Sequence, residues 1–265
     1  MKNFYVQYFN ELYQKTNLLG EGGFGKVYNG YRRRDNMPVA IKELPMKSIL
    51  KMDCAGRPLE IDILERVQHI PGVIQMLDWF VEEDKFLVIM EKFGQADLFN
   101  YVVDKGPLEE PVARYIFKQV YEIITKCKEE GIVHRDIKDE NILFDEETLK
   151  VKLIDFGVSD IYQDGEYKEF SGTIHYAPPE WFVRGRYIAQ GIEVWSLGTL
   201  LYALVSNEIP YQEPEDIFQG PLKWQEEPNL SPEVKDLISK CLTISDKERL
   251  KLEDIKMHPW MNCRN

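Results

Sequence analysis

Between residues 16 and 90, short apolar runs alternate with turn residues. The runs cover 26–28, 38–41, 73–81 and 86–90, and Gly, Asp-Asn and Glu-Glu-Asp segments separate them. Runs of this length bounded by such turn signals are typical of β-strands. One helical pattern interrupts them after Pro58, where apolar residues recur every third position. This part of the chain predicts a small β-rich lobe with one main helix.

After Gly94 the pattern becomes mainly helical. Apolar residues follow a 3.6-residue spacing over 112–127 and stop before Gly131, a residue that can cap a helix. The segment 192–204 is apolar nearly all round, which predicts a helix buried in the middle of a lobe. Ser231-Pro232-Glu233 has the cap-then-proline order of another helix start.

These patterns predict an α+β fold with two lobes. We expect an N-terminal extension over 1–12 and one domain of two lobes over 13–262. Within that domain the N-lobe covers about 13–90, a hinge covers 91–94, and the C-lobe covers 95–262.

The charge and cysteine content restrict the class of protein. Of 265 residues, 45 are acidic and 33 are basic, which gives a net charge of −12. Nucleic acids and anionic membranes bind clustered basic residues, so neither is expected as a partner, whereas a basic partner fits. The four cysteines form no CxxC pair, which indicates reduced thiols in a cytosolic protein. No apolar run reaches the roughly 18 residues of a membrane span. We expect a monomeric protein located in the cytoplasm, and a nuclear location is also compatible with the sequence.

The first chemical motif is rich in glycine. Residues 20–27 read G-x-G-x-x-G-x-V. Dinucleotide-binding folds use similar glycines, but they need a strand, a loop and a helix in succession. Here the glycines lead into the strand pattern at 26–28, which favours a hairpin that lies over phosphates. A purely structural hairpin is the alternative reading of this motif alone.

A lysine and a glutamate support the phosphate reading. The apolar strand pattern at 39–41 ends in Lys42, and Glu60 lies on the inward face of the helix predicted after Pro58. A lysine at a strand end is normally solvated, and a lysine that binds phosphates has to be held by a carboxylate. We therefore expect an ion pair between Lys42 and Glu60.

The most informative segment reads His-Arg-Asp-Ile-Lys-Asp-Glu-Asn over 134–141, and Asp155-Phe156-Gly157 follows the apolar strand pattern at 151–154. Phosphoryl transfer needs an acceptor for the proton of the attacking hydroxyl, which Asp136 can supply. It also needs oxygen ligands for Mg²⁺, which Asn141 and Asp155 can supply. Lys138 can neutralise charge on the transferring group. In this order, the motifs resemble the protein-kinase signature set.

The resemblance implies a two-lobed protein-kinase fold with ATP and Mg²⁺ as its ligands. Val27, Ala40 and Leu143 are expected to enclose the adenine, and Leu64, Leu77, His134 and Phe156 to stack as the regulatory spine. The full implied ATP-binding set is Leu19, Gly20, Gly22, Gly25, Val27, Ala40, Lys42, Met90, Glu91, Phe93 and Leu143.

Other positions follow from the same resemblance. Glu180 closes an Ala-Pro-Pro-Glu variant of the A-P-E element and is expected to pair with Arg249. Thr173 lies where kinases specific for serine and threonine bridge the catalytic aspartate and lysine. Lys138, two residues after Asp136, also favours Ser/Thr acceptors.

The chain also resembles a narrower group, the Pim family of serine/threonine kinases, over roughly 13–262. The segments that carry this resemblance are 77–80, 97–99, 134–143, 178–181, 194–198 and 258–261. Pim hinges have a proline and one more residue, whereas here Phe93 retains a backbone N–H for the adenine. Pim enzymes favour an acidic residue, part of the pocket for basic substrates, at the position that Asn100 occupies here. Glu193 occupies a position where most kinases have an aspartate and Pim enzymes commonly have alanine, and the sequence gives no account of it.

Regulation and substrate choice follow as hypotheses. Arg135 marks kinases in which a phosphate orders the activation loop, and Glu169 can pair with it without modification, so we expect activity that does not depend on phosphorylation. Asp97, Asp139 and Glu140 are expected to bind arginines of basic Ser/Thr protein substrates. A pseudokinase scaffold and a tyrosine kinase are the alternatives, and the intact catalytic and metal-binding residues argue against the first.

Overall fold

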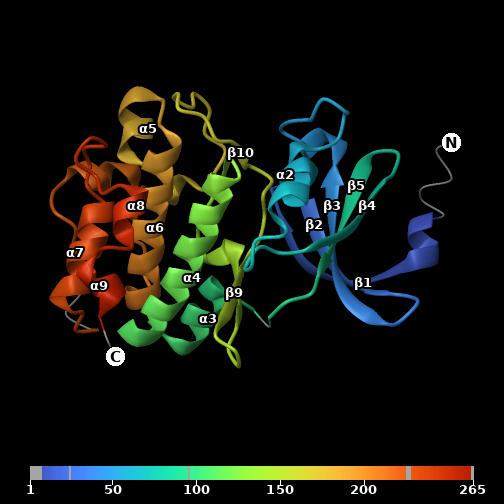
Figure 1. Ribbon diagram of the computed structural model, residues 1–265, viewed down its shortest axis with the longest axis horizontal. Coiled ribbons are helices and arrows are strands. Elements are labelled where there is room, and N and C mark those ends of the chain that lie inside the picture. The colour runs from blue at the N-terminus through green and yellow to red at the C-terminus, as the bar shows by residue number, and fades with distance from the viewer. Residues whose placement is uncertain (1–7, 24, 95, 225–227, 264–265) are drawn as a thin grey trace. The chain divides into compact units, whose positions relative to one another are not determined.

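The computed structural model describes residues 8–23, 25–94, 96–224 and 228–263. The chain divides into two compact units, one over 1–93 and one over 94–265 (Figure 1). We call them the N-unit and the C-unit and describe each by itself. The boundary between Phe93 and Gly94 falls within the segment expected to be the hinge.

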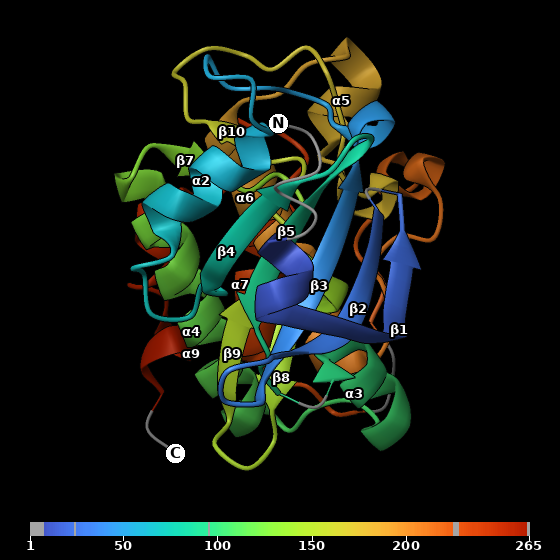
Figure 2. The same cartoon turned by 90° about the vertical axis from the view of Figure 1, so that its right-hand side faces the viewer.

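The N-unit contains one antiparallel sheet of five strands in the order β1-β2-β3-β5-β4 (Figure 2). Its elements are β1 (Tyr13–Gly22), β2 (Gly25–Arg32), β3 (Met37–Pro45), the 3₁₀ turn η1 (Met46–Ser48), α2 (Leu59–Val67), β4 (Met76–Val81) and β5 (Lys85–Glu91). Helix α2 buries Ile61, Leu64 and Val67, the residues whose spacing predicted it. The sheet and this helix confirm the expected β-rich lobe.

The packed core of the N-unit begins before residue 13. Residues 8–12 are helical, and Phe9 is buried in a cluster with Ile41, Phe80 and Ile89. The rings of Phe9 and Phe80 meet edge to face, with centroids 5.5 Å apart. Residues 9–12 of the expected N-terminal extension are therefore part of the lobe.

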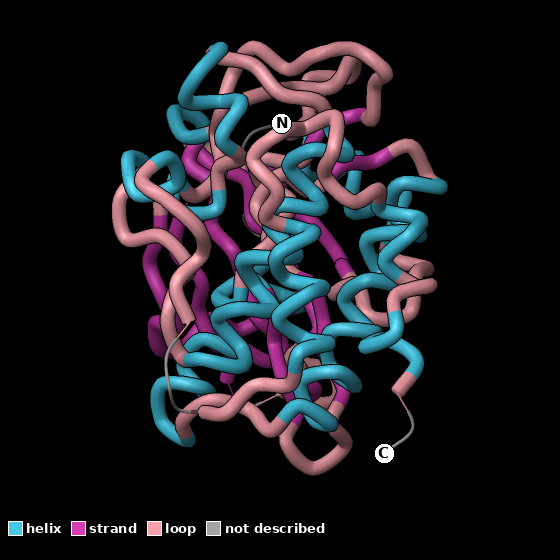
Figure 3. The backbone as a smooth tube through the Cα atoms, turned by 90° about the vertical axis from the view of Figure 1, so that its left-hand side faces the viewer, coloured by secondary structure: helices cyan, strands magenta, loops and turns pink. Residues whose placement is uncertain are grey.

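The C-unit is mainly helical (Figure 3). Its helices and 3₁₀ turns are α3 (Leu98–Lys105), α4 (Glu110–Glu129), η2 (Asp139–Asn141), η3 (Ile174–Tyr176), α5 (Pro179–Arg184), α6 (Ala189–Ser206), η4 (Pro214–Phe218), α7 (Pro232–Cys241), α8 (Leu252–Ile255) and α9 (Pro259–Asn262). Helix α6 contains the apolar segment 192–204 and is buried along nearly its whole length. Among the residues that the structure describes, no helix combines the length and the apolar character needed to cross a membrane.

Two small sheets of the C-unit position its loops. Strands β6 (Ala96–Asp97), β8 (Ile142–Asp145) and β9 (Lys150–Leu153) form one sheet, and β7 (Ile132–Val133) pairs with β10 (Asp160–Ile161) in the other. The segment 134–141 therefore runs between two anchored strands, and Asp155 lies just beyond the end of β9. Short ladders thus fix both ends of the loops that carry the candidate chemistry.

Candidate active site

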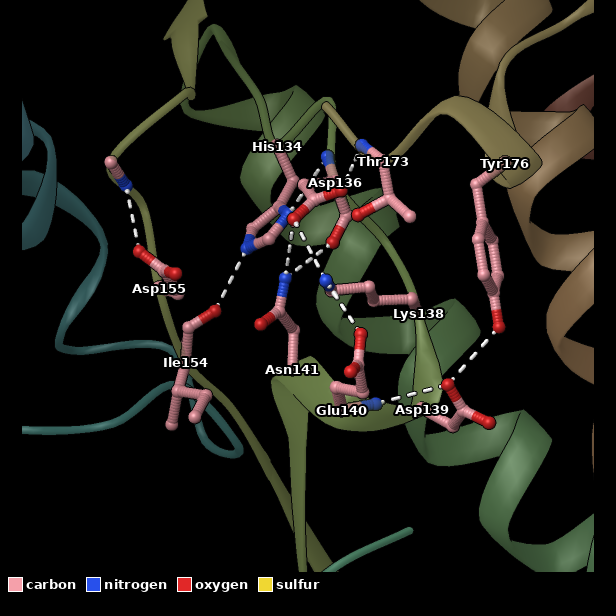
Figure 4. A network of polar contacts seen from close by, with 11 residues as sticks. His134, Asp136, Lys138, Asp139, Glu140, Asn141, Ile154, Asp155, Thr173 and Tyr176 are labelled. Atoms are coloured by element: carbon pink, nitrogen blue, oxygen red, sulfur yellow. Dashed lines mark hydrogen bonds and ion pairs between the residues drawn. The ribbon is translucent and has the colours of Figure 1, made fainter. Parts of the chain in front are cut away.

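The Asp136 carboxylate is held by two donors that the loop structure supplies (Figure 4). Its Oδ1 atom accepts a hydrogen bond of 2.7 Å from the backbone N–H of Thr173, and its Oδ2 atom accepts one of 2.9 Å from Asn141 Nδ2. Residue Asp136 is only 6% exposed. Both donors orient the carboxylate within the loop.

His134 fixes the geometry of the same loop. Its Nδ1 atom accepts the backbone N–H of Asp136 at 3.3 Å, so its Nε2 atom carries the proton and donates to the carbonyl of Ile154 at 3.0 Å. Burial lowers the pKa of this imidazole, which favours the neutral form. The ring of Phe156 packs edge to face on it, with centroids 4.8 Å apart. The structure thus brings together the two expected spine residues of the C-unit.

Lys138 lies between two carboxylates. Its Nζ atom is 2.6 Å from Glu140 Oε2 and 3.7 Å from Asp136 Oδ2. Burial opposes the charged form, but the two carboxylates outweigh it and raise the pKa of Lys138 above its usual value. A permanent positive charge therefore lies next to the carboxylate of Asp136.

Asn141 and Asp155 have the chemistry of ligands for a hard cation. The Asn141 amide nitrogen donates to Asp136 O at 2.8 Å and to the Asp136 carboxylate, which leaves the amide oxygen to coordinate. Asp155 adopts φ = 61°, an uncommon backbone conformation for a residue other than glycine, and its Oδ1 atom accepts the N–H of Gly157 at 3.3 Å. The described residues contain no group of three or more His, Cys, Asp or Glu side chains able to hold a metal. The Asn141 amide oxygen and the Asp155 carboxylate fit Mg²⁺, which uses one or two protein ligands together with phosphate and water.

In the N-unit, the structure brings Lys42 and Glu60 together. Lys42 Nζ on β3 lies 2.6 Å from Glu60 Oε1 on α2, and the two side chains are 8% and 7% exposed. Because a buried charge is costly unless it is paired, each side chain needs the other in this position. The pair fixes α2 on the sheet and presents a lysine beside the glycine-rich hairpin.

The glycine-rich segment forms a strand-to-strand hairpin. Gly22 on β1 pairs with Gly25 on β2, and Gly20 pairs with Val27. Gly25 has φ = 141°, and a Cβ atom there would lie 1.9 Å from the carbonyl oxygen of Glu43. Only glycine fits this position. The strand that follows excludes the dinucleotide-binding reading, which needs a helix after the glycines.

The other expected ATP-binding residues are divided between the units. Val27 pairs with Lys42 across β2 and β3, and Ala40 pairs with Met90 across β3 and β5. Leu143 lies on β8 of the C-unit. Elsewhere in the set, the exposed Leu19 precedes the hairpin glycines, Glu91 accepts the N–H of Gln75 at 2.8 Å, and Phe93 is the last residue of the N-unit.

All three expected substrate-binding acids have structural partners. Asp97 caps α3, where it accepts the backbone N–H of Asn100 at 2.7 Å and the Asn100 side-chain amide at 2.8 Å. Asp139 accepts the hydroxyl of Tyr176 at 3.1 Å, and burial raises the pKa of this carboxyl. Glu140 is half exposed, although it also pairs with Lys138.

A pocket of about 310 Å³ in the C-unit adds an acid that sequence reasoning missed. Its lining includes Asp139, Glu140, Thr173 and the exposed Glu208, which follows the end of α6. No lysine or arginine is among the described residues that line it. Glu208 follows an Asn-capped helix end, and nothing local to the sequence distinguishes it from a solvated turn residue.

Thr173 lies beside Asp136 and donates its backbone N–H to the Asp136 carboxylate. One contact of the activation segment differs from expectation. Arg135 does not pair with Glu169, whose side chain is exposed; its Nη1 atom instead lies 3.6 Å from Asp160 Oδ2. The reason is the β7–β10 ladder, which places Asp160 opposite Val133, two residues before Arg135.

Glu180 and Arg249 form a buried two-pronged pair. The distances are 2.9 Å from Nη1 to Oε1 and 2.7 Å from Nη2 to Oε2, and the side chains are 3% and 2% exposed. Further donations from Arg249 to the carbonyls of Gly191 and Thr243 connect α5 to α6 and to the segment before α8. Parallel bonds of this kind are strong and specific in geometry, so the pair stabilises this part of the C-unit.

Glu193 on α6 is 1% exposed, and neither of its carboxylate oxygens has a hydrogen-bond partner in the described part of the chain. Burial raises its pKa to about 8, with Lys128 acting in the opposite direction. The side chain is therefore protonated at neutral pH. It does not bond the backbone of 134–135, which an aspartate at this position bonds in most kinases.

Comparison with known proteins identifies the family. The family model for the protein kinase domain matches residues 13–261. The serine/threonine-protein kinase pim-2 of Danio rerio is 40% identical over 96% of this chain and 86% of its own length. The serine/threonine-protein kinase prk-2 of Caenorhabditis elegans is 38% identical over 96% of this chain and 59% of its own. The PAS domain-containing serine/threonine-protein kinase of Mus musculus is 36% identical over 94% of this chain and 18% of its own. The chain therefore belongs to the protein kinase family, as a serine/threonine kinase that resembles the Pim enzymes.

Proposed function

We propose that this kinase transfers the γ-phosphoryl group of Mg·ATP to serine or threonine in Arg/Lys-rich protein substrates, without needing a phosphate on its activation segment. The observation that carries the substrate class is the pocket of about 310 Å³ with the acids Asp139, Glu140 and Glu208 in its wall. A pocket lined by acidic side chains attracts positively charged groups, and the protein as a whole is acidic, with a net charge of −12.

In this proposal Asp136 orients the substrate hydroxyl and accepts its proton. The backbone N–H of Thr173 and the amide of Asn141 hold the carboxylate through its two oxygens, so it does not have to reorganise during the reaction. Lys138 lies 3.7 Å from this carboxylate and supplies positive charge where the transferring group becomes more negative. In the N-unit, the ion pair with Glu60 holds Lys42 in position for the nucleotide phosphates.

Asn141 and Asp155 would hold the Mg²⁺ that accompanies the nucleotide. When bound, the ion neutralises charge on the phosphates. The Asn141 amide is oriented for this task, because its nitrogen is used by Asp136 and its oxygen is the remaining coordinating atom.

Within the pocket the three acids do not offer the same charge to a substrate. The Tyr176 hydroxyl engages Asp139, and burial raises the pKa of that carboxyl, so it contributes less to attraction. Glu140 and Glu208 are both exposed enough to meet an incoming guanidinium. The neighbouring Phe99 and Val102 can cover the apolar stem of an arginine.

A positional-scanning peptide array with labelled ATP and Mg²⁺ tests the proposal. We expect label on Ser/Thr peptides with enrichment of arginine before the acceptor. In Glu208→Ala and Glu140→Ala the KM for the arginine peptides should rise roughly tenfold, the effect of losing about 1.4 kcal/mol of charged hydrogen bonding.

The matched control is Glu129→Ala, an exposed acid at the end of α4. It should leave the arginine preference unchanged. Asp155→Ala should abolish transfer. An array without arginine preference would refute the substrate class, and label in wild type equal to that in Asp155→Ala would instead indicate a scaffold that does not catalyse.

A further inference from the structure

Arg135 has a partner other than the one its sequence neighbourhood suggests. The residue is 6% exposed and adopts φ = 65° immediately before the catalytic aspartate. Its Nε atom donates to the carbonyl of Val158 at 2.6 Å, and its guanidinium lies 5.5 Å from the centroid of the Tyr167 ring. The carboxylate beside it belongs to Asp160, at 3.6 Å from Nη1. A buried guanidinium thus has its counter-charge within the unmodified chain.

The backbone determines where Asp160 lies. Strand β10 pairs with β7, and the register sets Asp160 opposite Val133. Because β7 leads directly into His134 and Arg135, this ladder brings the carboxylate to the arginine without any modification of the chain. The Asp160 side chain is 13% exposed, and its Oδ1 atom also accepts the N–H of Ile161 at 2.9 Å.

After this ion pair, a series of contacts packs the activation segment against the loop that carries Arg135 and Asp136. Tyr167 and Tyr187 exchange two backbone hydrogen bonds, of 2.7 and 3.1 Å, and their rings stack with centroids 5.6 Å apart. Phe170 then packs on Trp181, with ring centroids 5.5 Å apart. Beyond it, a Cβ atom on Gly172 would lie 2.5 Å from the carbonyl oxygen of Arg135, so the segment passes close to the arginine backbone.

We infer that Asp160 is a positioning residue, the built-in counter-charge that holds Arg135 and, through it, the segment whose Thr173 amide bonds the catalytic Asp136. A phosphate on this segment would find the guanidinium already paired. This inference rests on the proposed function for its kinetic readout only. Its structural consequence, an ordered segment at 162–172 that depends on Asp160, can be measured whether or not the protein catalyses.

The first experiment compares Asp160→Asn with two controls in phosphatase-treated full-length protein. Asp160→Asn removes the charge and keeps the shape, so we expect kcat to fall roughly 3- to 30-fold, the usual range for residues that act through a neighbour. The KM for ATP should change little, and Asp160→Glu should recover part of kcat. Glu169→Gln and Asp164→Asn, both at exposed positions of the same segment, should keep the wild-type kcat.

A double-mutant cycle shows whether Asp160 acts through Arg135. In an Arg135→Ala background, Asp160→Asn should have almost no further effect on kcat, because the group it positions is gone. Additive losses would overturn the inference. If Asp160→Asn lowers the Tm too far for kinetics, the double variant should regain Tm over Asp160→Asn, since the unpaired charge is removed; no recovery would count against the pair.

Hydrogen exchange separates this inference from the proposed function. Amides of 162–172 should exchange faster in Asp160→Asn than in wild type or in Asp164→Asn. If no form transfers phosphate, the proposed function fails while faster exchange still supports the inference. Unchanged exchange together with unchanged Tm would refute the inference, even in an enzyme that is active.

Discussion

Replacing Glu193 by glutamine should remove a strong pH dependence from the stability of this kinase. The wild-type carboxyl is buried in α6 without a hydrogen-bond partner in the described part of the chain, and its pKa is raised from 4.5 to about 8 by burial. A group with a raised pKa in the folded state binds a proton more tightly there than in the unfolded chain. Stability from this group is therefore fully present below pH 4.5 and is lost as the pH rises toward 8.

The size of the effect follows from the same two pKa values. They are about 3.5 pH units apart, and each unit corresponds to about 1.36 kcal/mol, so Glu193 costs roughly 5 kcal/mol at pH 8 and above relative to acidic solution. At pH 7 the cost is still roughly 3 kcal/mol. Such values are a large part of the roughly 5–15 kcal/mol by which domains are stable. Glutamine keeps the shape of the side chain and does not titrate.

Urea denaturation of wild type and Glu193→Gln at pH 5, 6, 7 and 8 measures the effect. The free energy of unfolding of the variant relative to wild type should rise by roughly 1.4 kcal/mol for each pH unit through this window. Other titrating groups cancel in the difference between the two proteins. Glu129→Gln, an exposed position on α4, should show a difference that does not change with pH. Parallel stability curves for wild type and Glu193→Gln would show that the carboxyl is solvated or paired, contrary to the reasoning.

Three further predictions concern pairs and close contacts. Arg249→Met should lower the free energy of unfolding by roughly 3–5 kcal/mol, because it leaves the buried Glu180 carboxylate without its counter-charge, and a loss below about 1 kcal/mol in chemical denaturation would contradict this. Glu60→Gln should lower kcat/KM for ATP by at least about tenfold by releasing Lys42, with nucleotide titration as the check and an unchanged value as the contrary result. Gly25→Ala should lower the affinity for nucleotide or the Tm, because its Cβ would lie 1.9 Å from a backbone carbonyl oxygen. Gly23→Ala is the matched control and should change little, because no atom lies within 4 Å of the added Cβ.

Local patterns were sufficient to predict most of the fold. The four short apolar runs became strands β2 to β5 of the N-unit, whereas β1 corresponds to none of them. The all-apolar segment became the buried α6. The helical residues before Tyr13 were missed, although Tyr8, Phe9 and Leu12 have the spacing of an apolar helical face. One turn of helix is too short for periodicity to be recognised, and only packing against the sheet reveals its role.

In the candidate site, the order of the motifs along the sequence identified the chemistry, but it did not predict every side-chain contact. The Lys42–Glu60 pair was predicted from the strand-end lysine and the inward face of the following helix, and the Glu180–Arg249 pair from the family resemblance. The structure brings both pairs together. The partner of Arg135 did not follow, because the ladder that selects its carboxylate consists of two-residue strands. Strands of that length leave no alternation to read.

A related limit applies to Asp97. Its acidic side chain suggested a role with substrate, but Asn100 three residues later has the spacing of a helix N-terminus. The structure uses Asp97 as the cap of α3. A cap signal was therefore legible in the sequence, and a carboxylate with that local task has less freedom to bind a ligand.

The aromatic contact of Phe9 with Phe80 affects how this enzyme should be shortened. A fragment cut at residue 13, where the kinase family model begins, would lack the ring that covers Phe80 and the Leu12 carbonyl that accepts the N–H of Arg33. The outer surface of the sheet would then expose hydrophobic side chains to water and promote aggregation during purification. Expression clones that retain residues 8–12 avoid that hazard.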